Sequence, residues 1–254
     1  LPSKGLLYPE GSELAKGVVE VFKNKPFTKL CGATFLVFNG FQLVASFSFF
    51  IIVFYMYNGS YEDTGNWPAW FSTVTAIMTA FLVIPIVTLI SNKYGKRNAF
   101  IISTAISMVG YILKWWAFDP SNPYLLFMPI PFMAFGLGGL FTLMMSMTAD
   151  VCDLDELRNG MPRREGTFGA IYWWMVKLGQ AIALVLGGLV LKLVGFESGA
   201  ATQTVEAMTN LRIADIVIPS VTAALAILVM WNYSLNEDKA EEIKEELVSR
   251  RGEL

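Results

Sequence analysis

One lysine lies deep within a long apolar stretch of the chain. Lys177 is about ten residues into the segment Thr167–Val194, which is ~15 Å into a helix that rises ~1.5 Å per residue. The hydrocarbon core of a bilayer is ~30 Å thick, so this depth is near the midplane, where a lysine costs roughly 2.5–3.5 kcal/mol. The sequence therefore predicts that Lys177 offers its charge and donors to a substrate in a water-filled cavity. The alternative is a structural pair with a carboxylate of a neighbouring helix, although none of the six apolar stretches has an Asp or Glu at mid-depth.

Aromatic and amide side chains surround this lysine in the sequence. Trp173 and Trp174 precede Lys177 by four and three positions, so both can share its helical face, and Tyr172 precedes them. A flat aromatic ring can stack on the apolar face of a sugar, while Gln180 adds a polar group on the same stripe. Packing of the aromatic side chains into lipid or against another helix is the equally weighted alternative.

A second polar stripe runs along the first apolar stretch. Asn39, Gln42 and Ser46 are spaced i, i+3 and i+7, which places them on one helical face. They can line a cavity together with the Lys177 stripe, or they can form hydrogen bonds between helices.

A dense charge cluster separates the fourth and fifth apolar stretches. Asp150 and Asp153 can share a helical face and meet Arg163 or Arg164, and such arginine–carboxylate pairs are directional. We expect a gating network that closes one transporter state and opens in the other, formed by Asp150, Asp153, Arg163, Arg164 and Glu165. The alternative is that these groups are hydrated loop charges of little energetic weight.

The same cluster admits one catalytic interpretation. Asp150, Asp153 and Asp155 could bind Mg²⁺ and a diphosphate, as in a membrane prenyltransferase. Such sites need carboxylates from two helix ends, whereas this chain offers one cluster with arginines beside it. We therefore expect neither an enzyme nor a metal site.

The composition excludes several other classes. Hydrophobic residues make up 54% of the chain and charged residues only 16%, against roughly a quarter in soluble domains. A net charge of −2 provides no basic surplus for nucleic acid. Histidine is absent, and the two cysteines, Cys31 and Cys152, have no CxxC spacing, so a His-ligated metal, a zinc site or a disulfide framework has no support and no cofactor is expected.

Six apolar stretches are long enough to cross a bilayer, which takes about 20 residues each. Since backbone groups must be satisfied internally in lipid, the sequence predicts an all-α membrane protein with six transmembrane helices. The stretches are Leu30–Tyr57, Trp70–Ile90, Ala99–Phe118, Tyr124–Thr148, Thr167–Val194 and Ile213–Tyr233.

The connections between the stretches predict the orientation. Segments 58–69, 119–123 and 195–210 contain no Lys or Arg, whereas the alternate connections and both ends are basic, so the basic side is expected to be cytoplasmic. Residues 1–29 then form a cytoplasmic lead-in, 30–235 the six-helix unit, and 236–254 a charged, solvated tail. The chain begins at Leu1 without a signal-peptide pattern, and we expect it to be part of a longer protein.

Three stretches of sequence resemble a known family signature. They are TADVCDLDELRNG from Thr148, RREGTFGA from Arg163 and VKLGQA from Val176. Together with the basic loop NKYGKR after the second stretch, they are similar to the glycoside–pentoside–hexuronide:cation symporters, the melibiose permease family of the major facilitator superfamily. The resemblance covers the whole chain but only the C-terminal six of the family's twelve helices.

The resemblance implies a function and roles for several residues. It implies one half of a major facilitator fold that symports a sugar or glycoside with Na⁺ or H⁺ in the inner (plasma) membrane. The partners would be the sugar, membrane lipid and the N-terminal six-helix half, which holds the cation-binding carboxylates. Lys177 matches the family's membrane-embedded lysine, and Asp150, Asp153 and one of the two arginines match its cytoplasmic charge network. Tyr172 and Trp173 fall where the family has polar sugar contacts, so they depart from its pattern.

Two further alternatives remain. A lipid or lysolipid carrier can use the same fold, and a sensor or scaffold that does not transport would leave Lys177 unexplained.

Overall fold

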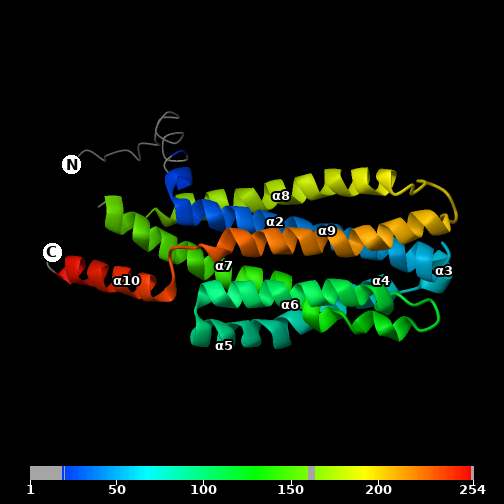
Figure 1. Cartoon of the computed structure of the whole chain (residues 1–254), viewed down its shortest axis with the longest axis horizontal. Helices are drawn as coiled ribbons and strands as arrows, with labels where there is room; N and C mark the ends of the chain where they lie inside the picture. Colours follow the sequence, from blue (N-terminus) through cyan, green and yellow to red (C-terminus); the bar gives the residue numbers. More distant parts are fainter. Residues whose placement is uncertain (1–18, 20, 160–163, 253–254) are drawn as a thin grey trace, which may run out of the picture.

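The computed structural model describes residues 19, 21–159 and 164–252, which are helical with short connections and contain no strand within these ranges. Six helical spans run side by side as one elongated bundle (Figure 1). Each is long and apolar enough to cross a membrane, which confirms the prediction of an all-α membrane protein with six transmembrane helices.

Several of the six spans are built from more than one helical piece. The first joins α2 (Lys25–Phe50) to the π-helix η1 (Ile51–Met56), and the fourth joins η3 (Pro123–Phe127) to α7 (Ile130–Asn159). The other elements are α3 (Tyr61–Thr64), α4 (Trp67–Met78), η2 (Thr79–Val83), α5 (Ile84–Tyr94), α6 (Lys96–Ala117), α8 (Glu165–Leu193), α9 (Val205–Trp231) and α10 (Glu237–Gly252). The π-helical η2 joins α4 to α5 just before Pro85, which cannot donate a helical hydrogen bond.

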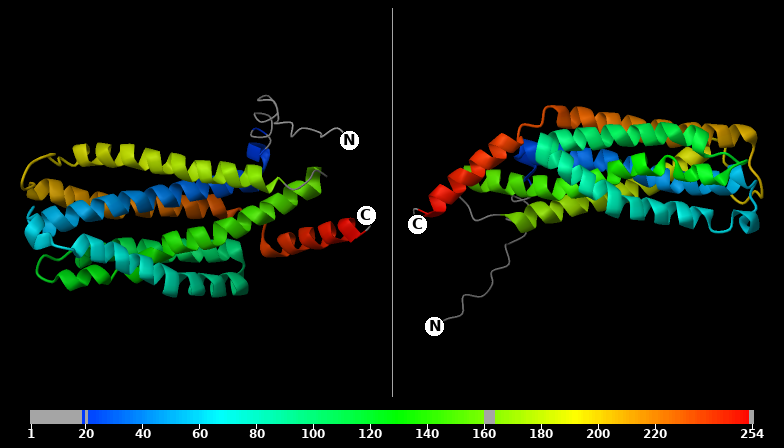
Figure 2. Two further views of the ribbon diagram at one scale, coloured as in Figure 1. Left: turned by 180° about the vertical axis from the view of Figure 1, so that it is seen from behind. Right: turned by 90° about the horizontal axis from the view of Figure 1, so that it is seen from below.

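Two helices form the centre of the bundle. In the most apolar windows of α2 and of α7, 61% and 56% of the residues are buried, against 11% for the α4–α5 span and 22% for α8. α6 and α9 pack against each other and behind α2 and α7, whereas α4 and α8 lie at the flanks. We call the side formed by α2, α4, α7 and α8 the open face; it is turned toward the viewer in the left view of Figure 2.

Small residues allow the close approach of these helices. A Cβ added at Gly139 of α7 would lie 2.7 Å from Cβ of Ser103 in α6. One added at Gly40 of α2 would collide with Oγ1 of Thr222 in α9. Because lipid supplies no hydrophobic drive between helices, tight contacts of this kind hold membrane bundles together.

The connections gather at two opposite ends. The start of α2, the turn between α5 and α6, and α10 lie at one end, and α3 lies at the other together with the connection between α8 and α9 (Figure 1). This is the alternation that the sequence predicts. We call the end that carries α10 the basic end.

The structure corrects two helix boundaries. α9 begins at Val205, eight residues before the predicted start, so Asp215 is well inside a helix. The expectation that the spans lack a mid-depth acid is therefore wrong. α7 continues to Asn159, past the predicted end of the span at Thr148, so all three aspartates of the charge cluster lie on this helix.

The charged tail is also more than a solvated segment. Ala240, Ile243 and Leu247 of α10 are at most 8% exposed, and α10 packs against the end of α7. The spacing i, i+3, i+7 places these three residues on one apolar stripe of the helix. The many charged residues between them made this stripe difficult to recognise in the sequence.

Candidate functional site

Lys177 lies on the exposed side of α8. Within the described part of the chain it has no ion-pair partner. The helix around it has the length and hydropathy of a membrane span. A deep cation without a partner from its own bundle is available to an outside group.

The two predicted polar stripes meet one helical turn from this lysine. Gln42 and Ser46 of α2 and Gln180 of α8 line one pocket of about 230 Å³, which we call the polar pocket. Gly187 and Gly188 widen its α8 wall because they carry no side chain. Gln180 is one turn along α8 from Lys177, so amide groups and a charge lie along one helix edge.

Asn39 fixes the crossing of the two helices. Its Nδ2 donates to the carbonyl of Phe35 at 2.8 Å and faces Gly179 of α8, where an added Cβ would lie 2.9 Å away. Oδ1 of Asn39 is buried and has no hydrogen-bond partner among the described residues. Asn39 therefore lies between the helices, next to the polar pocket, and retains one unused acceptor.

The three aromatic residues before Lys177 do not share one surface. Tyr172 is fully buried, and its hydroxyl accepts a 3.5 Å hydrogen bond from Oγ1 of Thr34. Trp173 is 44% exposed and stacks on Phe141 of α7 at a centroid distance of 6.2 Å, and Trp174 is 59% exposed. Only the two tryptophans are available for contacts at the surface of the bundle.

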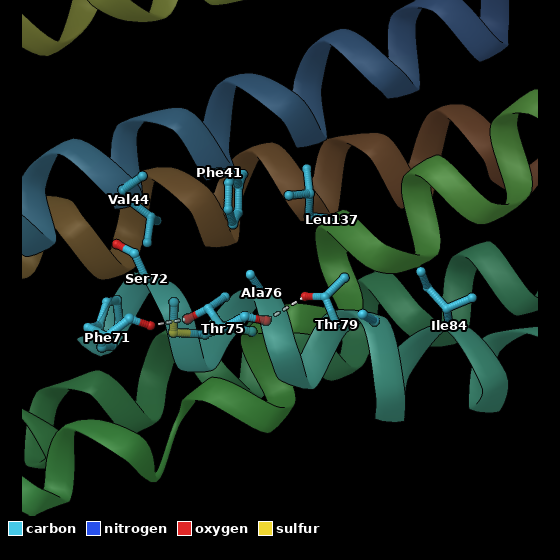
Figure 3. A pocket seen from close by; sticks show the side chains of 12 residues that line it. Phe41, Val44, Phe71, Ser72, Thr75, Ala76, Thr79, Ile84 and Leu137 are labelled. Atoms are coloured by element: carbon cyan, nitrogen blue, oxygen red, sulfur yellow. Dashed lines mark hydrogen bonds between the residues drawn. The ribbon is translucent and has the colours of Figure 1, made fainter. Parts of the chain in front are cut away.

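A larger, apolar pocket lies on the other flank of α2. It has a volume of about 460 Å³ and is bounded by α2, α4, η2, the start of α5, and α7 (Figure 3). The sequence shows its hydroxyl residues, Ser72, Thr75 and Thr79, at helical spacing, but no sequence pattern distinguishes this pocket from ordinary packing.

The charge cluster at the basic end has other partners than predicted. Asp150 pairs with Lys96 at 2.5 Å and with Lys244 of α10 at 3.1 Å. Lys96 also lies 3.8 Å from Glu237. Among the described residues, Asp150 therefore pairs with lysines of two distant segments, whereas the sequence predicts Arg163 or Arg164 as its partner.

Arg164 pairs with a different aspartate. Its Nε and Nη2 donate to the two oxygens of Asp155 at 2.9 and 2.7 Å, and Asn159 donates to the same carboxylate at 2.8 Å. Asp150, Asp153 and Asp155 are each at most 7% exposed, so they are not hydrated loop charges. Glu165 opens α8, where the helix dipole favours an acid. Arg163 lies outside the described residues.

These contacts raise the pKa of the Lys244 side chain. Partial burial acts to lower the pKa, but the hydrogen bond with Asp150 and the charges of Asp150, Asp153 and Glu237 outweigh it. Lys244 is therefore held in its charged form, and α10 is tied to α7 and to the α5–α6 turn through one carboxylate.

The same contacts argue against a magnesium site. Asp150 and Asp155 already face Lys96, Lys244 and Arg164. In the part of the chain that the structure covers, no group of three acidic, histidine or cysteine side chains has a metal-binding arrangement.

One buried ion pair was missed by the sequence reasoning. Lys114 of α6 pairs with Asp215 of α9, and its Nζ also donates to Oγ of Ser48 in α2 at 3.1 Å. Arg212 lies 4.2 Å from the ring of Tyr55 and 4.4 Å from that of Trp115. The sequence signal that could have revealed this pair is a lysine and an aspartate that each lie within a predicted apolar stretch, Lys114 in the third and Asp215 in the sixth.

Comparisons with known proteins identify the class. Residues 6–237 match the family described as MFS/sugar transport protein. The chain is 28% identical to the glucuronide carrier protein homolog of Escherichia coli K12, over 90% of this chain and 48% of the relative. It is 26% identical to the putative sulfoquinovose importer of the same organism, over 94% and 49%. The sodium-dependent lysophosphatidylcholine symporter 1-B of Danio rerio is 23% identical over 89% and 42%. The chain thus spans about half the length of these relatives.

Proposed function

The chain belongs to the MFS/sugar transport protein family, among the glycoside–pentoside–hexuronide:cation symporters, and we propose that it forms the C-terminal half of a transporter that carries a sugar or glycoside with a cation. Its six spans make one half of a major facilitator fold, and its family and relatives are transporters and not enzymes. Two such halves would rock around a midplane site between them.

The observation that carries this proposal is the position of Lys177 one helical turn from Gln180, which lines the polar pocket. Gln42, Ser46 and Gln180 supply donors and acceptors for sugar hydroxyls, and Lys177 supplies a charge at the edge of the same helix. Trp173 and Trp174, exposed on the same helix, would stack on the apolar face of a sugar ring. Tyr172 supports this wall from within through Thr34.

Coupling to Na⁺ or H⁺ would require a carboxylate near Lys177. Within the described spans the buried acid Asp215 is already paired with Lys114, on the side of α6 and α9. We therefore assign the coupling carboxylates to the N-terminal half. A cation that binds them would compete with Lys177, which links ion binding to substrate binding.

The charge cluster at the basic end is assigned to gating. The pairs Asp150–Lys96, Asp150–Lys244 and Asp155–Arg164 connect α7, α10, the α5–α6 turn and the start of α8. We propose that this network, with Asp153, Glu165 and Arg163, stabilises one state of the alternating-access cycle and is broken in the other.

The proposed location is the plasma membrane, with the basic end in the cytoplasm. Residues 1–29 and 236–254 would then lie inside the cell, and the six-helix unit would contact lipid and the N-terminal half. The lysolipid carrier is the second candidate, since one relative carries that name and the apolar pocket could take an acyl chain.

The test is uptake by the full-length protein in proteoliposomes. Accumulation of a labelled sugar or glycoside that requires an imposed Na⁺ or H⁺ gradient supports the proposal. The six-helix unit alone, reconstituted as the control, should not accumulate substrate. Accumulation of lysophosphatidylcholine with no response to any glycoside would reject the sugar assignment.

A further inference from the structure

A third pocket lies where α3, the first turn of α4 and η3 meet. Its volume is about 360 Å³, and it shares no lining residue with the polar or the apolar pocket. α3 marks the end of the bundle opposite the basic end (Figure 1). Asp63 and Asn66 line it with a carboxylate and an amide. The rest of its wall is mostly aromatic, formed by Trp67, Trp70, Tyr124 and Phe127. We call it the aromatic pocket.

Contacts between distant segments hold this aromatic wall in place. The ring centroid of Trp67 lies 5.4 Å from that of Tyr124, nearly perpendicular at 84°, and 6.1 Å from that of Phe127. Gly65 has a φ of +50°, which residues with a side chain rarely adopt. This turn between α3 and α4 places Asp63 and Trp67 in one pocket. The pocket is therefore a built feature of the fold.

Its outer rings and polar groups are available to a ligand. Trp70 is 57% exposed and Tyr124 is 73% exposed. Asp63 is exposed, and in the described part of the chain its carboxylate has no ion-pair partner. Asn66 precedes α4 without capping the helix through its side chain. A carboxylate accepts hydrogen bonds, and an amide both donates and accepts them.

The charge around the pocket disfavours an anionic ligand. Segments 58–69 and 119–123 contain Glu62, Asp63 and Asp119 and no Lys or Arg. A phosphate or a carboxylate bound here would be repelled and would find no cation in the lining. Aromatic residues are common at membrane interfaces. An interfacial belt, however, does not require a hollow that also contains a carboxylate and an amide.

A neutral pyranose ring fits this combination of groups. One face of the ring presents C–H groups that pack on an aromatic face, and its edge presents hydroxyls that donate and accept hydrogen bonds. A quaternary ammonium ion would also be attracted by the aromatic faces and by Asp63. It has no group that hydrogen-bonds to Asn66, so the pocket suits a sugar better.

We propose, on the basis of the function inferred above, that the aromatic pocket is a second carbohydrate subsite, separate from Lys177. A neutral pyranoside packs there on Trp70 and Tyr124 and forms hydrogen bonds with Asp63 and Asn66. With the basic end in the cytoplasm, this subsite meets the sugar outside the cell before the sugar reaches Lys177. Its binding is weak, since both outer rings remain largely exposed.

The first experiment separates the two sites in the full-length protein. Saturation-transfer difference NMR in lipid nanodiscs free of glycoside detergents measures weak binding of methyl glucoside and methyl galactoside. Lys177→Met disables the deep site, so the binding that remains reports on the aromatic pocket. In this background Trp70→Ala should weaken binding about tenfold. Trp116→Ala is the matched control, because Trp116 is 62% exposed on α6 and lies outside the pocket.

The second experiment tests the charge of the pocket in the same Lys177→Met background. Each methyl glycoside should bind about fivefold better at low salt than the matched methyl uronide, whose carboxylate is repelled by Asp63. Asp63→Asn should remove this preference. Glu197→Gln is the control, since Glu197 is an exposed acid of the α8–α9 connection outside the pocket. It should keep the preference.

The outcomes separate this inference from the function on which it rests. Sugar binding that is unchanged by Trp70→Ala, with transport intact, would overturn the subsite and leave sugar transport standing. Binding that depends on Trp70 in a protein that transports no sugar would support the subsite and reject the proposed function. Binding of tetramethylammonium that Trp70→Ala removes, without binding of either glycoside, would show a cation site and reject the sugar.

Discussion

Lys114 of α6 and Asp215 of α9 form an ion pair within the bundle, where both side chains are at most 1% exposed. Lys114 also donates to Ser48, so this pair joins α2, α6 and α9 at one point. The polar pocket and Lys177 depend on the position of α2, and the pair contributes to that position from the opposite side.

Breaking this pair should destabilise the protein strongly. Asp215→Asn leaves Lys114 charged, buried and without its partner, and should cost about 3–5 kcal/mol of folding free energy. Unfolding of the purified protein in detergent measures the loss. Asp63→Asn, at an exposed position on α3, is the control. The double variant Lys114→Met with Asp215→Leu should recover most of the stability, and an Asp215→Asn protein as stable as the parent would contradict the role of the pair.

Lys177 should be required for transport and not for folding. Lys177→Met keeps much of the side-chain volume and removes the charge, so cation-driven accumulation should fall to background while the yield of folded protein is retained. Lys177→Arg should not restore it, because the guanidinium is wider and effectively always charged. Lys192→Met, at an exposed lysine in the last turn of the same helix, is the control and should be active. Wild-type accumulation by Lys177→Met would reject the assignment.

The gating network predicts a charge-swap rescue. Asp155→Arg should impair uptake by removing the bidentate contact with Arg164, and adding Arg164→Asp should partly restore it. Glu246→Lys is the comparison, since it disturbs an exposed pair with Arg250 that is worth at most about 1 kcal/mol. No effect of Asp155→Arg on transport or on conformational accessibility would leave the cluster with a structural role alone.

The docking of α10 should weaken in strong alkali. The pKa of Lys244 is raised in the folded protein above its ordinary value of 10.5, so its contribution is complete below that value and is lost as the pH rises through the raised pKa. A fluorophore at Val248, an exposed position on α10, should give a constant signal across the neutral range and report release in strong alkali. Lys244→Met should lack this alkaline step, and a transition near neutral pH would contradict the assignment.

The orientation can be tested by cysteine labelling in intact cells. A membrane-impermeant thiol reagent should reach cysteine at Glu62 or Ser198 and not at Asn92, because the basic end is expected to be cytoplasmic. Both cysteines of this chain are buried, so they add little background. Labelling at Asn92 without labelling at Glu62 would reverse the topology.

The number of spans and the location of the candidate site followed from local properties of the chain. A run of about 20 apolar residues must form a helix in lipid, whatever surrounds it. A lysine within such a run is costly, which made Lys177 recognisable. The sequence likewise shows that Gln42 and Ser46 share one helical face. In the structure this face lines a pocket together with Gln180.

The tertiary structure decided which polar groups meet. Asp150 had arginines nearby in sequence, yet it pairs with Lys96 and Lys244, since α10 folds back onto α7 through a sparse apolar stripe. Tyr172 precedes two exposed tryptophans but is turned into the core, because one step along a helix rotates a side chain by ~100°. The packing of the helices decides which distant charges pair and whether a hollow forms between α2, α4 and α7. No local sequence pattern encodes that packing.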